Sequence, residues 1–130
     1  MDSQFHHIGI PVDKSELSNK ARFSPLFQMY SEEFTNNLGI RIEFHAFEQQ
    51  SCLDDRIKNM PHIAFKVGNI EKALEDKEIV LPLYEPFKGY RCAMICLNGL
   101  LIELIDTNLS ESKIWEDEAT LKDGILYGHT

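Results

Sequence analysis

The stretch His7-Ile8-Gly9-Ile10-Pro11-Val12 is matched later in the chain by His62-Ile63-Ala64-Phe65-Lys66-Val67. In both stretches a histidine begins an alternating apolar run, which is typical of a half-buried β-strand. A second matching pair follows, because Gly39–Glu43 and Gly99–Glu103 each place a glutamate four residues after a glycine. The chain therefore carries the order His, Glu, His, Glu, which indicates an internal duplication.

The second half of the sequence predicts one strand, one helix and three further strands. Asn69 can cap the helix, and Asn98-Gly99 is the strongest hairpin signal in the chain. The first half has the same order, but its helix is short and one strand is weak or missing. Strand alternation places His6 and His7 on opposite faces. The predicted ranges are 62–67, 69–76, 79–84, 90–97 and 100–105 in the second half, and 5–12, 26–33 and 40–48 in the first.

The length of 130 residues fits a single domain, 1–130, which can bury an ordinary core. We divide it into module one at about 5–48, module two at about 61–106 and a C-terminal tail at 107–130. The tail could form an amphipathic helix over residues 110–122 that packs on the body, or a frayed or partner-binding segment. These features predict an α+β fold, in which two βαβββ modules, the first contracted, form a curled mixed sheet around a cup.

The composition excludes several classes of function. The net charge of −8 argues against electrostatic binding to nucleic acid or to an anionic membrane. No apolar run approaches the roughly 18–20 residues that a membrane span requires, and no signal peptide is visible. The three cysteines, Cys52, Cys92 and Cys96, form no CxxC pair, which favours a reducing cytoplasm. We expect a cytoplasmic protein with a small-molecule partner, and a homodimer, because a half-open sheet leaves apolar surface to cover.

The duplicated pairs predict a metal site in the cup. Taken alone, His7 is typical of a hydrogen-bonded strand histidine, whereas Glu103 lies in an apolar run and needs a partner, because burying a bare carboxylate is costly. Taken together, His7 faces His62 and Glu43 faces Glu103 across the cup. Such ligands suit a divalent ion of Zn, Ni, Co, Mn or Fe(II). His45 shares the strand and the face of Glu43, so it is the alternative fourth ligand.

Three segments also carry a family resemblance, and they are Phe5–Asp13, Pro61–Val67 with Ile70–Leu74, and Asn98–Ile105. They resemble the vicinal oxygen chelate superfamily, which includes lactoylglutathione lyase, methylmalonyl-CoA epimerase, extradiol dioxygenases and the fosfomycin and bleomycin resistance proteins. The resemblance implies two βαβββ modules around a metal, with one ligand from the first and one from the last strand of each module. Those positions fall on His7, Glu43, His62 and Glu103.

The resemblance implies that substrate oxygens bind the metal, which stabilises an enolate or enediolate. We predict a glyoxalase-like, metal-dependent isomerase, epimerase or lyase for a small carbonyl compound, with Glu43 or Glu103 as the catalytic base. The alternatives are an Fe(II) extradiol-type dioxygenase with two histidines and one glutamate, or a non-catalytic drug- or metabolite-binding protein. The chain departs from the family in its first module, where the long helix has no counterpart. It also has no clear arginine pair for glutathione or CoA, and only Arg41 and Arg91 are candidates.

Overall fold

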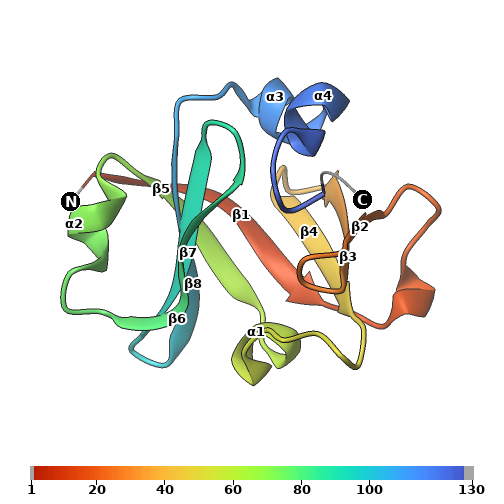
Figure 1. Cartoon of the computed structure of the whole chain (residues 1–130), viewed down its shortest axis with the longest axis horizontal. Helices are drawn as coiled ribbons and strands as arrows, with labels where there is room; N and C mark the ends of the chain where they lie inside the picture. Colours follow the sequence, from red (N-terminus) through yellow and green to blue (C-terminus); the bar gives the residue numbers. More distant parts are fainter. Residues whose placement is uncertain (1, 128–130) are drawn as a thin grey trace.

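The computed structural model describes residues 2–127, which form one eight-stranded sheet and a few short helices (Figure 1). The strands are β1 Ser3–Pro11, β2 Arg22–Ser24, β3 Met29–Thr35, β4 Arg41–Phe47, β5 His62–Val67, β6 Glu78–Phe87, β7 Tyr90–Leu97 and β8 Leu100–Thr107. The helices are the 3₁₀ turn η1 Lys14–Glu16, and α1 Asp55–Asn59, α2 Ile70–Leu74, α3 Glu111–Trp115 and α4 Glu118–Lys122. Along the sheet the strands lie in the order β2-β3-β4-β1-β5-β8-β7-β6, so each half of the chain builds one half of the sheet.

The two halves have the same strand pairing, which confirms the predicted α+β class and the curled mixed sheet. β1 pairs in parallel with β4, and β5 pairs in parallel with β8, while β1 and β5 run antiparallel at the centre. In each half the remaining strands extend outward as an antiparallel meander. The four central strands, β4-β1-β5-β8, are therefore the first and last strands of the two halves, and they carry the four predicted ligands.

Local sequence signals account for the elements of the second half. The side chain of Asn69 accepts a hydrogen bond from the N–H of Lys72 and caps α2, as predicted. The helix ends earlier than predicted, at Leu74, and Asp76 then has a φ of 58°. Asn98 and Gly99 have φ values of 54° and 79°, which is typical of the two-residue turn expected between β7 and β8.

The first half is contracted, as predicted, and differs in its helix and its outer strand. Only the 3₁₀ turn η1 occupies the position of the helix, where the side chain of Asp13 accepts from the N–H of Ser15. The predicted strand 26–33 is wrong at its start, because residues 25–28 form a turn in which Gln28 has a φ of 51°. The weak strand is β2, which has three residues.

The C-terminal tail folds back over the sheet as α3 and α4 (Figure 1). Ile114, Trp115 and Leu121 are buried in one cluster with side chains of β6 and β7. The N–H of Leu126 donates to the carbonyl of Pro86, so the tail belongs to the body as far as residue 127, and residues 128–130 lie outside the described chain. Each α-helix has five residues, and no helix within residues 2–127 is long and apolar enough to span a bilayer.

Candidate metal centre

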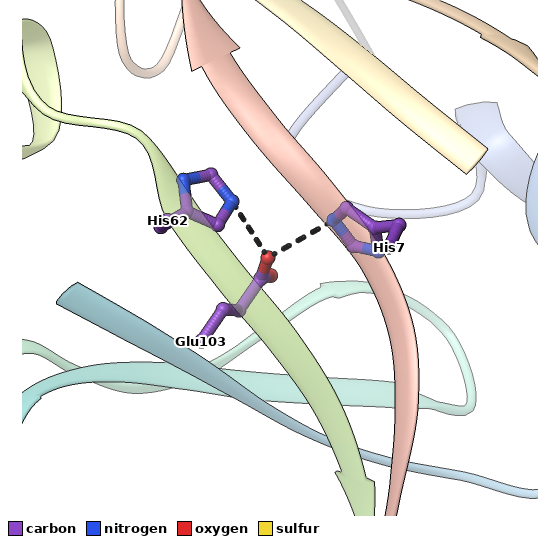
Figure 2. A group of neighbouring side chains, drawn as sticks. All are labelled: His7, His62 and Glu103. Carbon is purple, nitrogen blue, oxygen red and sulfur yellow. Dashed lines mark ion pairs between the residues drawn. The ribbon is translucent and has the colours of Figure 1, made fainter. Parts of the chain in front are cut away.

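Three side chains from neighbouring central strands converge on one another, and we call them the triad: His7 on β1, His62 on β5 and Glu103 on β8 (Figure 2). Oε1 of Glu103 lies 3.3 Å from Nε2 of His7 and 3.2 Å from Nε2 of His62. One donor atom of each residue lies within 4.8 Å of the other two. Two ligands held about 2.1 Å from an ion, at right angles, are about 3 Å apart. The distances from Oε1 of Glu103 to the two Nε2 atoms therefore fit a divalent ion shared by these residues.

The two imidazoles of the triad direct nitrogen atoms inward without a hydrogen-bond partner. His7 is 1% exposed and His62 is 5% exposed. Among the described residues, Nε2 of each ring is buried and unpaired, because its approach to Glu103 lacks the alignment of a hydrogen bond. Leaving one such atom unpaired costs about 1–3 kcal/mol. A metal ion would use both lone pairs, so the donor set and its environment fit a metal.

Gly9 provides the space that the imidazole of His62 occupies. The two residues lie opposite each other in the β1–β5 pair. A Cβ atom at position 9 would lie 2.0 Å from Cε1 and 2.4 Å from Nε2 of His62. Glycine inside a strand often marks such a close approach. Gly9 was not among the predicted site residues, although its place within a predicted strand was a usable signal.

Glu43 and His45 lie beside the triad on β4, outside the group of three donors. Oε1 of Glu43 is 3.6 Å from Nε2 of His7 and 3.3 Å from Nε2 of His45. The other ring nitrogen of His45, Nδ1, is 2.8 Å from Oγ of Ser31, so the ring is held between Ser31 and Glu43. All four predicted ligands thus gather within one chain, with Glu43 at the margin of the triad. Whether Glu43 or His45 is a fourth ligand stays a prediction.

Several solved structures are similar to this chain, among them the following two. A hypothetical protein from Bacillus halodurans has a TM-score of 0.63 and 16% identity, over 85% of this chain and 98% of that one. A mutant of 4-hydroxymandelate synthase from Streptomyces coelicolor has a TM-score of 0.53 and 10% identity, over 92% of this chain and 52% of that one. The chain has the vicinal oxygen chelate fold. The predicted resemblance is therefore confirmed at the level of the fold.

The likeness to known proteins is one of structure. No protein-family model matches the sequence, and no curated protein matches it. This chain spans about half the length of the 4-hydroxymandelate synthase that it resembles. At these identities the likeness establishes the vicinal oxygen chelate fold, and the function has to be argued from the site.

Within this vicinal oxygen chelate fold, burial and mutual contacts set the charges at the site. Burial lowers the pKa of His62, whereas for His7 the carboxylates of Glu103 and Glu43 outweigh burial and raise the pKa. Burial would raise the pKa of Glu103, but its contacts with the two histidines hold the pKa well below 4.5. The pKa of Glu43 is also lowered, because His45 and His7 outweigh burial. Both glutamates are therefore ionised at neutral pH, as a ligand or a base requires.

His6 turns toward His7, so the expectation that they point to opposite faces is wrong. The pairing of β1 with β5 shifts between Phe5 and His7, which makes His6 the extra residue of a β-bulge and ends the alternation there. Nδ1 of His6 lies 2.8 Å from Nδ1 of His7, and Nε2 of His6 lies 2.9 Å from Oε1 of Glu111. The His6 ring also stacks on Trp115, with centroids 5.5 Å apart. Burial and the neighbouring His7 lower the pKa of His6, so this ring is neutral at pH 7.

The site opens into a cavity that is lined by residues of the sheet and of the C-terminal tail. Its walls are mainly aliphatic and aromatic, and Arg22 is the one lysine or arginine among the described lining residues. Such a wall suits the carbon skeleton of a small molecule. The aromatic lining comes from both modules and from the tail, through Phe27, Phe47, Tyr84, Phe87, Tyr90, Trp115 and Tyr127.

Three further residues, the cysteine Cys92 and the candidate arginines Arg41 and Arg91, have no catalytic arrangement in the part of the chain that the structure describes. Cys92 lines the cavity, but burial, followed by the charge of Glu103, raises its pKa well above 9.0, so the thiol stays protonated. Arg91 lies outside the cavity, paired with two carboxylates. Arg41 pairs with a carboxylate of β3, and its guanidinium lies 4.9 Å from the centre of the Trp115 ring. Neither arginine lines the cavity, so neither supports a glutathione or CoA site there.

Proposed function

We propose that this protein is a metal-dependent, glyoxalase-like enzyme that moves a proton at the carbon next to a carbonyl group, as isomerases, epimerases and lyases of this type do. One observation carries the proposal: two buried, unpaired imidazole nitrogens and one carboxylate oxygen gather beside a cavity. His7, His62 and Glu103 would hold the ion. Zn, Ni, Co, Mn and Fe(II) all suit this donor set.

Glu43 is the residue that we assign as the base. A bound divalent ion would polarise the substrate carbonyl and make the neighbouring C–H more acidic. Glu43 is ionised, and it lies next to the triad without belonging to it. His45 lies 3.3 Å from its carboxylate, and Ser31 orients His45 in turn, so Glu43 is held toward the site. Glu103 lies between the two histidines, which supports a role as ligand rather than base.

The proposed substrate is a small carbonyl compound with an apolar or aromatic body. Its oxygen atoms would meet the triad, and its carbon skeleton would pack against the aliphatic and aromatic walls. A pocket of this kind derives affinity from its apolar walls and orientation from a few polar groups. The polar groups here are the triad and Glu43.

Metal binding is the first part of the proposal to test. Purified protein, stripped with chelator and reconstituted separately with Zn²⁺, Co²⁺, Ni²⁺, Mn²⁺ and anaerobic Fe²⁺, is expected to retain about one ion per chain, as the single triad requires. His7→Ala and His62→Ala should each retain none after desalting, because each removes an inward-facing donor. Elemental analysis measures the metal content. Cys52→Ser, which removes an exposed thiol, should retain the wild-type amount. A wild-type protein without bound metal would end the proposal.

The assignment of Glu43 predicts a separation of chemistry from metal binding. Metal-loaded wild-type protein in D₂O is expected to exchange the α-hydrogen of some members of a panel of small 2-hydroxy and 2-oxo carbonyl compounds, as followed by NMR. Glu43→Gln should keep its metal but exchange about 10²- to 10⁴-fold more slowly, the usual contribution of a general base. Glu32→Gln is the control, because Glu32 lies on the adjacent strand but accepts hydrogen bonds from Ser18. Unchanged exchange in Glu43→Gln would exclude it as the base.

A second candidate function is oxygenation with Fe(II). Two histidines and one carboxylate form the ligand set of many non-haem iron oxygenases, and the triad has this composition. Oxygen consumption by the Fe(II)-loaded protein with catechols, without α-hydrogen exchange, would favour this function. If neither reaction occurs, and ligands stabilise the protein equally with and without chelator, the protein is a binding protein.

A further inference from the structure

We propose that His6 and Glu111 are positioning residues that fix the tautomer of His7, so that the lone pair on Nε2 of His7 faces the metal. The inference rests on the proposed metal centre and extends it to the β-bulge and the C-terminal tail. Its basis is a chain of contacts that runs from the carboxylate of Glu111 through His6 to Nδ1 of His7.

The carboxylate of Glu111 decides which atom donates and which accepts in each of these contacts. An ionised carboxylate only accepts hydrogen bonds, so Nε2 of His6, which lies 2.9 Å and 3.1 Å from the two oxygens of Glu111, must carry a proton. The two Nδ1 atoms can hydrogen-bond only if one of them holds a lone pair, and a metal on Nε2 of His7 leaves that ring its proton on Nδ1, so Nδ1 of His6 is the acceptor. Nδ1 of His7, 2.8 Å away, must then be the donor. His7 therefore has its proton on Nδ1 and a lone pair on Nε2.

The lone pair on Nε2 of His7 is directed toward the proposed metal position. This atom is the one that approaches Glu103 and has no hydrogen-bond partner. The opposite tautomer would place a hydrogen there, and an N–H cannot be a metal ligand. A histidine ligand is commonly fixed in this way by an acceptor behind it, and losing that acceptor typically lowers metal affinity about 10- to 100-fold.

The C-terminal tail holds Glu111 and His6 in place. Glu111 begins α3, and Nε1 of Trp115, at the end of the same helix, donates to Oε1 of Glu111 over 3.1 Å. The Trp115 ring stacks on His6 and meets the His7 ring edge-on, with centroids 5.3 Å apart. The side chain of His6 is only 5% exposed and that of Glu111 is 53% exposed, so the contacts lead from the surface to the buried ring of His7. The packing of α3 therefore helps to fix the orientation of His7, the proposed metal ligand on β1.

The test compares variants that keep the ring stacking with variants that keep the hydrogen bonds. His6→Phe retains an aromatic ring against Trp115 but removes the acceptor, and should lower Zn²⁺ affinity about 10- to 100-fold in titration calorimetry. His6→Gln offers an amide oxygen and an N–H, and should recover part of the loss. Glu111→Ala should weaken binding as His6→Phe does. Glu118→Ala is the matched control, because Glu118 also anchors the tail, through Arg22, but away from His6.

A second readout reports the tautomer without any metal. Long-range ¹H–¹⁵N spectra of wild-type apoprotein, recorded at a pH high enough to leave His7 neutral, should show its one ring proton on Nδ1, and in His6→Phe part of the population should carry it on Nε2. A proton on Nε2 of the neutral His7 ring in the wild-type apoprotein would overturn the inference, as would equal Zn²⁺ affinities of wild type and His6→Phe. Failure of the proposed function is distinct, because there the wild-type protein itself would bind no Zn²⁺.

Discussion

Glu103→Gln is expected to bind a divalent metal at least about 100-fold more weakly than the wild-type protein, since even outer-sphere contacts usually contribute about 10- to 100-fold. The amide keeps the size of the carboxylate and loses its charge. Glu103 is also the residue of the triad that contacts both histidines. Two neutral imidazoles would then remain for the ion. Titration calorimetry of the apoprotein with Zn²⁺ and Co²⁺ measures the loss, and wild-type affinity in the variant would remove Glu103 from the centre.

The same variant has an expected effect on the apoprotein as the pH falls. The pKa of Glu103 is held well below 4.5 in the folded state, mainly through His62 and His7 acting against burial. Its ionised form therefore stabilises the fold above about pH 4.5, and this contribution is lost as the pH falls through the folded-state pKa. Denaturant unfolding in the presence of chelator should show a smaller loss of stability on acidification for Glu103→Gln than for the wild type.

Gly9→Ala is expected to abolish metal binding almost as completely as His62→Ala, although it changes no ligand. The added methyl would lie 2.0 Å from the imidazole of His62, which is too close for any real contact. The ring is the movable partner, so it should rotate out of the triad while the backbone of β1 keeps its pairing. Metal content after reconstitution measures the effect, and circular dichroism checks that the sheet is intact.

Gly68→Ala is the matched control for Gly9→Ala. A Cβ atom at position 68 meets nothing within 4 Å, and Gly68 is not among the glycines with positive φ. The added methyl should therefore leave metal content unchanged. If Gly9→Ala bound metal as well as Gly68→Ala does, the imidazole of His62 would not need its observed position, and the triad would lose one ligand.

The centre could largely be predicted because a strand has a strict period of two. That period places His7 and His62 on the concave face, and the duplication brings their strands together at the centre of the sheet. The glutamates join them because each lies on the last strand of its module, which pairs in parallel with the first. The roles of His7, Glu43, His62 and Glu103 as ligands or base stay predictions. Homodimerisation and cytoplasmic location do so as well.

The rest could not be predicted because it depends on register and on contacts far apart in sequence. The bulge that turns His6 toward His7 is a slip between β1 and β5, and no local signal marks it. The contact of His6 with Glu111 joins residues that are 105 positions apart in the sequence. Leu26 and Phe27 favoured a strand by composition, but Phe27 is buried from within a turn.

The division of donors between the two halves bears on when the protein can first acquire its ion. A nascent chain that has released only its first half from the ribosome offers one imidazole and one carboxylate of the predicted set, His7 and Glu43. His62 emerges later with β5, and Glu103 later still with β8. If the proposed centre binds a metal, the ion can be held by the whole triad only after β8 has been made, and a fragment that ends before β5 lacks two of its three ligands.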